Sequence, residues 1–205
     1  MDKKIIITVG RQIGSGGRDV AKLLAEIFDC RLYDRELLNL AAKESGFSEK
    51  FFEQNDEHKG FFKSMFQMHS SFAECSFYRN EFSQENLFKF QSDAIVRAAS
   101  ESSCVFVGRC ADYILRDIPG KVDVFITADI DDRIARVVER KGCSCEQAAK
   151  MIANGESDRA SYYNYYTGKR WGHSESYDLC VNSSILGIEG TAKFIEDFIK
   201  LKVEK

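Results

Sequence analysis

Glycines and arginines are concentrated in one stretch near the start of the chain, Gly10-Arg11-Gln12-Ile13-Gly14-Ser15-Gly16-Gly17-Arg18. Glycines let backbone N–H groups turn toward an anion, and the arginine guanidinium is a charged fork of donors that matches phosphate oxygens. Phosphate binding is therefore the chemistry that these residue types favour. The residues expected to contact the phosphates are Gly10, Arg11, Gln12, Gly14, Ser15, Gly16, Gly17 and Arg18.

The flanking segments place this stretch between a strand and a helix. Residues 5–9, Ile-Ile-Ile-Thr-Val, are typical of a buried parallel strand, and apolar residues recur at helical spacing from Val20 to Phe28. A loop that ends at a helix N-terminus presents N–H groups and the positive end of the helix dipole to an anion. The alternative is a tight turn without a ligand, but the flanking arginines favour phosphate binding.

The stretch differs from a P-loop at two positions that carry chemistry. A Walker A loop reads G-x-x-x-x-G-K-[ST], with a lysine for the β- and γ-phosphates and a hydroxyl for Mg²⁺. When its second glycine is aligned with Gly16, its first glycine falls on Arg11. Gly17 then stands where the lysine belongs and Arg18 where the hydroxyl belongs. Arg11 and Arg18 are the candidates for the missing positive charge.

Two arginines further along the chain follow predicted strands. Arg109 comes after the apolar run Cys104–Val107, at the end of a strand where open α/β sheets bind ligands. Because the helix dipole disfavours a cation at a helix start, Arg109 is predicted to meet an anion rather than to be an ordinary surface residue. Arg133 lies in the helix after the next strand. It shares a face with Arg136 and Arg140, which is either a solvated basic face or one within reach of a nucleotide.

Asp34 follows the short predicted strand Arg31–Tyr33 and has two interpretations. It can cap the helix that begins at Arg35, or it can contact a ligand at the carboxyl end of the strand. One carboxylate can do both, so both interpretations stay open.

Five short apolar runs alternate with helical patterns, which predicts an α/β fold with a doubly wound parallel sheet in three layers. The strand order expected for a sheet of the P-loop nucleoside monophosphate kinase type is 2-3-1-4-5. Ser144 and Gln147 form a capping-box signature that predicts a helix start. Residues 156–172 are polar and rich in tyrosine, which is typical of a mobile lid that closes over phosphates.

Composition excludes several classes of protein. The net charge of −3 argues against a general nucleic-acid binder, because such domains are usually basic. No apolar run approaches the roughly 20 residues needed to span a membrane, and the first residues lack the longer apolar core of a signal peptide. Seven scattered cysteines indicate reduced thiols and a cytoplasmic location rather than a disulfide framework.

Taken together, the motifs resemble the cytidylate kinase-like family, a divergent branch of the P-loop nucleoside monophosphate kinases. The resemblance spans nearly the whole chain. Besides the glycine-rich stretch, it is carried by Tyr33-Asp34-Arg35-Glu36-Leu37, Val107-Gly108-Arg109-Cys110-Ala111-Asp112, the segment from Asp158-Arg159 to Trp171-Gly172, Tyr177-Asp178-Leu179 and Asn182-Ser183.

The resemblance implies a single kinase-like domain over residues 1–205. Its core would comprise residues 1–35, 85–155 and 176–205, with a helical acceptor-side insertion at about 36–84 and the lid at about 155–175. Eleven of the sixteen phenylalanines lie in residues 47–90, so this region is expected to serve in packing, as a homodimer face or as a flexible cover.

The resemblance also implies ATP- and Mg²⁺-dependent phosphoryl transfer to a small acceptor such as CMP or dCMP. Asp34, Arg35, Arg109 and Asp112 would bind the acceptor, and Ser15 would contact the metal. The catalytic arginines would be Arg18, Arg109, Arg133 and Arg159, and the lid would contribute Arg159, Lys169 and Arg170. This sequence departs from the family's D-G-R-D run at two positions, because Val107 and Cys110 replace its two aspartates.

Two alternatives to a nucleotide kinase stay open at the level of sequence. The missing lysine suggests a non-catalytic nucleotide or phosphate sensor. The insertion could instead rebuild the acceptor site for a non-nucleotide small molecule.

Overall fold

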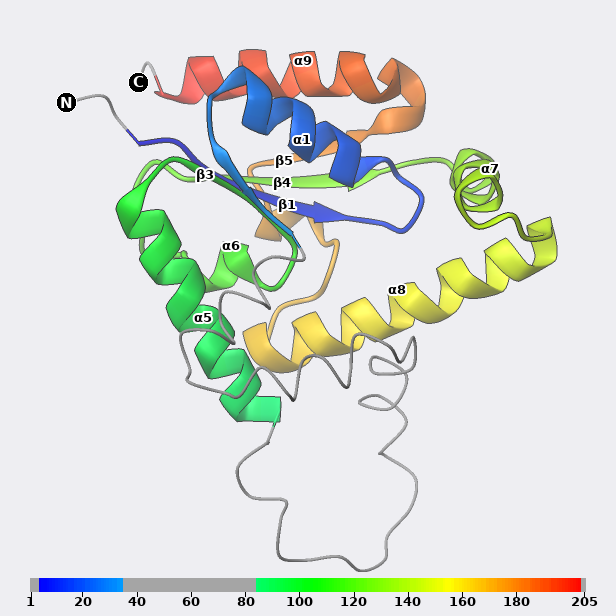
Figure 1. Ribbon diagram of the computed structural model, residues 1–205, viewed down its shortest axis with the longest axis horizontal. Coiled ribbons are helices and arrows are strands. Elements are labelled where there is room, and N and C mark those ends of the chain that lie inside the picture. The colour runs from blue at the N-terminus through cyan, green and yellow to red at the C-terminus, as the bar shows by residue number, and fades with distance from the viewer. Residues whose placement is uncertain (1–3, 35–83, 204–205) are drawn as a thin grey trace, which may run out of the picture. The chain divides into compact units, whose positions relative to one another are not determined.

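Figure 1 shows the computed structural model of the chain, which describes residues 4–34 and 84–203. Its strands form one five-stranded sheet with the order β2-β3-β1-β4-β5, and each neighbouring pair is parallel. The predicted α/β fold and strand order are confirmed. The strands are β1 (Ile6–Arg11), β2 (Arg31–Tyr33), β3 (Cys104–Val107), β4 (Val122–Thr127) and β5 (Leu179–Asn182).

Helices connect the strands in the described parts of the chain. They are α1 (Gly17–Ile27), α5 (Gln84–Glu101), α6 (Ala111–Ile114), α7 (Ile130–Lys141), α8 (Cys145–Thr167), the 3₁₀ turn η1 (Ser174–Ser176) and α9 (Ser183–Val203), which is kinked at Gly187.

Helix α8 differs from the sequence prediction in its length. The predicted capping box is confirmed, because the Ser144 side chain accepts from the Gln147 N–H and the Gln147 side chain accepts from the Ser144 N–H. The helix then continues through the segment predicted as a lid and ends where Gly168 turns left-handed at φ 66°. Residues 156–167 of that segment are therefore a direct extension of a core helix.

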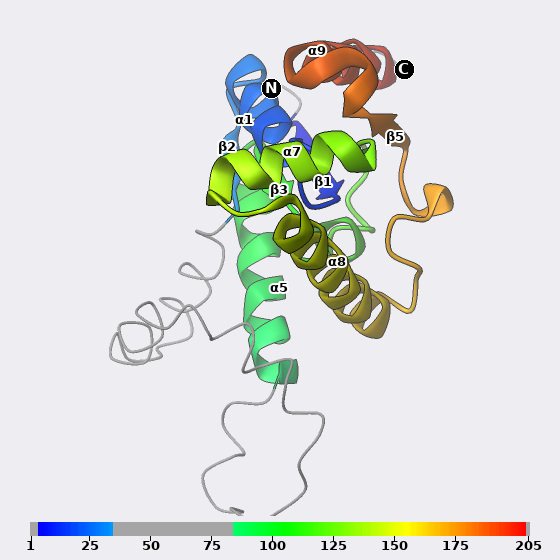
Figure 2. The same cartoon turned by 90° about the vertical axis from the view of Figure 1, so that its right-hand side faces the viewer.

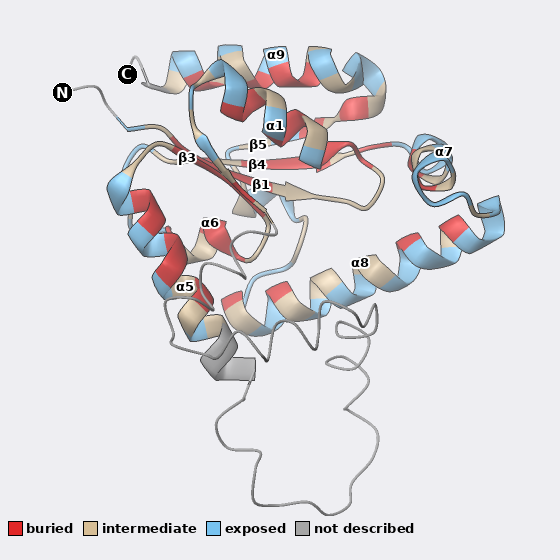
Figure 3. Ribbon diagram, in the orientation of Figure 1, coloured by how far each residue is buried: buried red, intermediate tan, exposed pale blue. Residues whose placement is uncertain are grey.

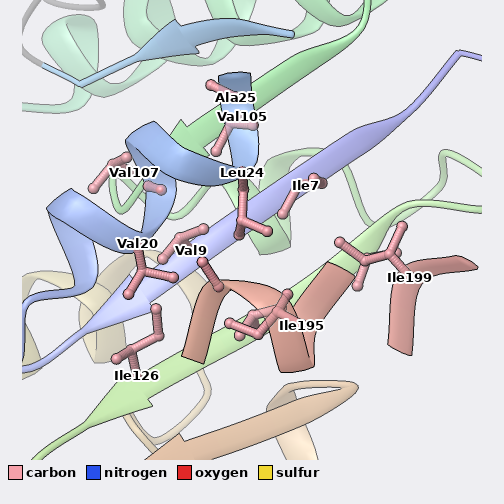
Figure 4. Packing of buried hydrophobic residues seen from close by; sticks show 14 of the residues in the cluster. Ile7, Val9, Val20, Leu24, Ala25, Val105, Val107, Ile126, Ile195 and Ile199 are labelled. Atoms are coloured by element: carbon pink, nitrogen blue, oxygen red, sulfur yellow. The ribbon is translucent and has the colours of Figure 1, made fainter. Parts of the chain in front are cut away.

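The sheet has a purely apolar face that packs against α1 and α9 (Figures 1 and 2). Ile7 and Val9 point to this side, where Leu24 and Ile195 are also fully buried. Figure 4 shows these side chains interleaved between the strands and the two helices. Burial of this many β-branched and leucine side chains is the main source of stability for the sheet.

The other face of the sheet carries polar and aromatic groups and lies on the side of α6 and α8 (Figure 1). Thr8 points to this side between Ile7 and Val9, and its Oγ1 donates to Asp123 Oδ1 at 2.6 Å. Phe125 contacts Trp171 and Tyr177, with ring centroids 5.3 and 4.9 Å apart. Figure 3 shows that the outer side of α8 is exposed, so its buried residues form a stripe on the inner side.

The chain divides into two compact units, Met1–Asp34 with Ala98–Lys205, and Arg35–Arg97. Arg35 and most of the phenylalanine-rich region lie outside the described residues, so the acceptor contact and the homodimer face predicted there stay predictions. Within the described ranges, no helix combines the length and the apolar composition needed to cross a bilayer.

Candidate functional site: an arginine cluster at a glycine-rich loop

The loop between β1 and α1 needs glycine at two positions. Gly14 and Gly16 have φ values of 78° and 74°, a left-handed conformation that side chains disfavour. A Cβ on Gly14 would lie 2.5 Å from the Arg133 carbonyl oxygen, and one on Gly16 would lie 2.0 Å from Ile188 Cδ1. The glycines therefore let the loop curl tightly against α7 and α9.

Side chains outside the loop bind its carbonyl groups. Arg133 Nε donates to the Ile13 oxygen at 2.8 Å, and Arg136 Nη1 donates to the Gly14 oxygen at 3.1 Å. The next carbonyl, that of Ser15, accepts from Ser183 Oγ at 2.6 Å. Three consecutive carbonyls are thus turned outward and satisfied.

The N–H groups of the loop are left available for a ligand. Within residues 4–34 and 84–203, the N–H groups of Gly14, Gly16 and Arg18 have no hydrogen-bond partner. Buried or partly buried N–H groups are normally paired, so a set of three free ones at a helix N-terminus is suited to an anion. This is the arrangement predicted for phosphate binding.

Four arginines, Arg11, Arg18, Arg109 and Arg159, form what we call the arginine cluster next to the loop. Arg18 Nε lies 2.7 Å from Asp34 Oδ2, and Arg11 Nη2 lies 3.9 Å from Asp34 Oδ1. Arg159 Nη1 donates to the Arg11 oxygen at 2.9 Å. The four arginines and Asp34 were all predicted from the sequence as site residues, and the structure brings these five together.

The cluster carries more positive charge than its acidic neighbours offset. Burial, together with the nearby charges of Arg159, Arg109 and Arg18, lowers the pKa of Arg11 to about 9, although the charge of Asp34 opposes the shift. Burial is also the main reason that the pKa values of Arg109 and Arg159 are lowered. Partly desolvated cations that repel each other are stabilised by a polyanion.

Arg109 reaches the cluster through an unusual turn at the end of β3. Gly108, Arg109 and Cys110 all have left-handed φ values, of 73°, 60° and 56°. For the two residues with side chains this conformation costs roughly 1–2 kcal/mol each. Strain of this kind at a strand end is consistent with a functional requirement for the position of Arg109.

The inner side of α8 brings an acidic residue to the loop that the sequence prediction missed. Glu156 Oε1 accepts from the Ile13 N–H at 3.0 Å and lies 2.6 Å from Arg133 Nη2. Glu156 and Arg159 are three residues apart, so they share one face of the helix. In the sequence, Ile152, Glu156, Arg159 and Tyr163 are three or four residues apart, which continues the helical pattern that begins after Ser144. This spacing is the signal that could have placed Glu156 on the inner side of the helix.

Arg133 and Gln12 have contacts that hold the loop rather than face the cluster. The Arg133 side chain is 5% exposed and is engaged by the Ile13 oxygen and Glu156. Gln12 donates its N–H to the Ile126 oxygen and accepts from the Ala128 N–H. The predicted contact of Arg133 with a transferring group stays a prediction, and positioning the loop is what its geometry supports.

Asp112 is joined to α8 by a buried hydrogen bond. Tyr163 Oη donates to Asp112 Oδ2 at 2.6 Å, and Tyr177 lies beside this pair. Burial raises the pKa of Asp112 above its ordinary value, although the bond from Tyr163 opposes the shift. Burial and the nearby Asp112 also raise the pKa of Tyr163. The predicted role of Asp112 in binding the acceptor stays a prediction. The contacts of Tyr163 and Tyr177 with Asp112 were not predicted from the sequence.

Lys169 and Arg170 are exposed and follow the end of α8. Their predicted role as lid cations stays a prediction. Ser15 Oγ is bonded within the loop, because it donates to the Gln12 oxygen at 2.9 Å and accepts from the Gly17 N–H at 3.3 Å. The residues fit phosphates. Among residues 4–34 and 84–203 no group of three or more acidic, histidine or cysteine side chains could hold a metal ion, and the predicted contact of Ser15 with Mg²⁺ stays a prediction.

Comparisons with known proteins agree with this fold. A cytidylate kinase from Pyrococcus horikoshii is 27% identical over 195 residues, which cover 94% of this chain and 87% of that protein. A cytidylate kinase from Thermococcus kodakarensis is 31% identical over 102 residues, 49% of this chain and 51% of that protein.

Two solved structures resemble the chain over nearly its full length. An uncharacterized protein from Eubacterium ventriosum has a TM-score of 0.74 and 30% identity, and the match covers 96% of this chain and 99% of that one. Shikimate kinase from Acinetobacter baumannii, in complex with shikimate, has a TM-score of 0.54 and 12% identity over 100% of this chain and 97% of that one, which shows a shared fold. Residues 6–185 match the cytidylate kinase-like family, and the chain belongs to that family.

Proposed function

We propose that the protein is an ATP-dependent kinase that transfers a phosphoryl group to a small acceptor, in first place a nucleoside monophosphate such as CMP or dCMP. The observation that carries this proposal is the arginine cluster beside a loop whose carbonyls turn outward and whose Gly14, Gly16 and Arg18 N–H groups have no partner among the described residues. Membership of the cytidylate kinase-like family supports it.

The residues divide between the two ends of the reaction. The N–H groups of Gly14, Gly16 and Arg18 would hold the phosphates of ATP, which supplies the phosphoryl group. Arg109 and Asp34, at the carboxyl ends of β3 and β2, are in position for the acceptor. Arg159 lies near both sets, since it donates to the Arg11 oxygen and the charges of Arg109 and Asp34 act on its pKa.

The chemistry asked of these residues is positioning and charge neutralisation. In phosphoryl transfer the charge spreads over the equatorial oxygens, and a well-placed arginine contributes about 10³–10⁵-fold to the rate. Arg159 is fixed by the loop it serves, so little reorganisation is needed when charge develops. Helix α8 holds the loop through Glu156, which accepts from the Ile13 N–H, and Arg159, which donates to the Arg11 oxygen.

The test is a transfer assay with purified protein, ATP, Mg²⁺ and a panel of nucleoside monophosphates, read by chromatography of the products. We expect formation of a nucleoside diphosphate from at least one acceptor. Arg109→Ala should raise the KM for the acceptor by about tenfold or more, because a charge-assisted contact is lost, while ATP binding is kept. The matched control is Arg116→Ala, an exposed arginine at the end of α6. Absence of any diphosphate above background would contradict the proposal.

A phosphate or nucleotide sensor without turnover is the second candidate. The observation that favours it is the Ser15 hydroxyl, which is used inside the loop and leaves Mg²⁺ without a hydroxyl ligand. Calorimetry of ATP binding with and without Mg²⁺ separates the two functions. A kinase should bind ATP more tightly with Mg²⁺, whereas a sensor should bind it equally well without the metal and show no turnover.

A further inference from the structure

We infer that Arg11 takes the place of the P-loop lysine, through an exchange of glycine and cation between positions 11 and 17. In the Walker pattern, glycine stands at the position of Arg11 and lysine at the position of Gly17. In this chain both residue types are present, with their places reversed. The inference rests on the proposed binding of phosphates at this loop, and it concerns which residue supplies the charge.

The packing explains why the two changes go together. A Cβ on Gly17 would lie 2.5 Å from Arg11 Cβ and 3.2 Å from Arg11 Cγ. The first contact is far closer than two carbon atoms can approach, and it involves the stem of Arg11 rather than its flexible end. The space in which a lysine side chain at position 17 would begin is therefore filled by Arg11. Only one of the two positions can carry a side chain.

The path of the Arg11 side chain leads from Gly17 into the arginine cluster. A Cβ on Gly108 would lie 2.0 Å from Arg11 Nη1. The guanidinium therefore packs directly against the glycine backbone at the end of β3. The Arg11 carbonyl is held by Arg159 Nη1 at 2.9 Å. Glycine at 108 and an arginine at 159 thus fix both ends of the residue, as a preorganised phosphate contact requires.

Arg18 is less suited to the same role. Its side chain is 51% exposed, compared with 21% for Arg11, and its Nε is paired with Asp34 at 2.7 Å. Arg11 Nη2 lies 3.9 Å from Oδ1 of the same carboxylate, which is longer than a hydrogen bond. Of the two cations, Arg11 is the less exposed and its pair with Asp34 is the longer one, so it gains more from a bound anion than Arg18 does.

The test is a cycle of variants, Arg11→Gly, Gly17→Lys and the double variant Arg11→Gly/Gly17→Lys. The probe is inorganic tripolyphosphate, titrated by calorimetry, and the second readout is the unfolding temperature without ligand. We expect each single change to weaken tripolyphosphate binding by about 10- to 100-fold, because a charge-assisted contact is lost or misplaced. The double variant should recover to within about threefold of the original protein.

The unfolding temperature separates steric exclusion from charge. Gly17→Lys should lower it when Arg11 is present and should lower it much less beside Arg11→Gly, where the nearest remaining contact is Ser15 Oγ at 3.3 Å. Because glycine in β1 can weaken the strand, Arg11→Met serves as a second loss-of-charge variant. It keeps the stem, so it should lose tripolyphosphate affinity with little change in unfolding temperature.

The matched control is Arg18→Gly/Gly17→Lys, which moves the same residue types but leaves the Arg11 stem in place. It should not recover tripolyphosphate binding. Recovery in this control, failure of the Arg11→Gly/Gly17→Lys variant to recover, or absence of tripolyphosphate binding by the original protein would overturn the inference. If the cycle behaves as expected but no transfer to an acceptor is found, the proposed kinase reaction fails and the assignment of Arg11 stands.

Discussion

The two faces of the sheet are built from different kinds of side chain. Toward α1 and α9, Ile7 and Val9 pack with Leu24 and Ile195 in the apolar core. Toward α6 and α8, the adjacent position Thr8 is bonded to Asp123, and Tyr163 is bonded to Asp112. One strand thus supplies apolar packing on one side and hydrogen bonds on the other.

The difference separates what stabilises the fold from what forms the site. Apolar burial is non-directional and contributes stability in proportion to area. The face toward α1 and α9 therefore stabilises the fold and presents no groups for binding or catalysis. Buried polar groups contribute less net stability but fix directions, which Arg109 and Arg159 need in order to face a common ligand. Substitutions on the two faces should therefore have opposite profiles for activity and stability.

The largest effect is expected from Arg159→Ala. This change removes a cation from the cluster and the donor to the Arg11 oxygen, so kcat/KM should fall by about 10³-fold or more. The free energy of unfolding should change little, because desolvation and repulsion already oppose the charge. Steady-state assays and urea unfolding check both parts, with exposed Arg116→Ala as the control. A fall in activity that only follows a loss of folded protein would contradict this assignment.

On the apolar face, Leu24→Ala should show the reverse profile. Removal of a fully buried leucine side chain lowers the free energy of unfolding by about 2–5 kcal/mol. Activity per folded molecule should be kept at a temperature where the variant is folded. Ile27→Ala on the same helix is the control, because its side chain is 43% exposed and its loss should matter much less. Equal destabilisation by both variants would show that the core does not lie where we describe it.

A smaller effect is expected for Tyr163→Phe, which deletes only the hydroxyl that donates to Asp112. An unsatisfied buried acceptor costs about 1–3 kcal/mol in unfolding free energy. Since Tyr163 and Arg159 are one turn apart, kcat should also decrease modestly as α8 loosens. Urea unfolding and kinetics measure the two effects, and Tyr165→Phe, with a 69% exposed residue, is the control. No change in either quantity would mean that this bond does not anchor the helix.

The smallest effect is a pH dependence from Asp112. Burial raises its folded-state pKa above the ordinary value of 3.8, so the folded protein retains a proton that the unfolded chain has lost. Stability should therefore fall as the pH rises from about the unfolded pKa through the higher folded pKa. In Asp112→Asn this contribution is absent, and its unfolding free energy should fall less over the same range. A steeper fall in the variant would contradict the direction of the shift.

Sequence patterns were sufficient for the sheet because apolar runs and glycines report directly on strands and turns. The meeting of Arg11, Arg109 and Asp34 at one edge of the sheet also followed, since parallel strands end at a common edge, whereas Arg159 was predicted through the family resemblance. The role of Glu156 did not follow, because its partner Ile13 is 143 residues away and no periodicity links them. The link between Arg11 and Gly17 was equally hidden, since an alignment shows two departures from a motif but not the 2.5 Å approach that joins them.

The most direct test of the account is a crystal structure of the protein with Mg²⁺ and a non-hydrolysable ATP analogue. We expect the β- and γ-phosphates on the N–H groups of Gly14, Gly16 and Arg18, with the Arg11 guanidinium on their oxygens and Arg159 facing the γ-phosphate. Phosphates bound elsewhere, or bound at the loop with Arg11 turned away from them, would contradict the account.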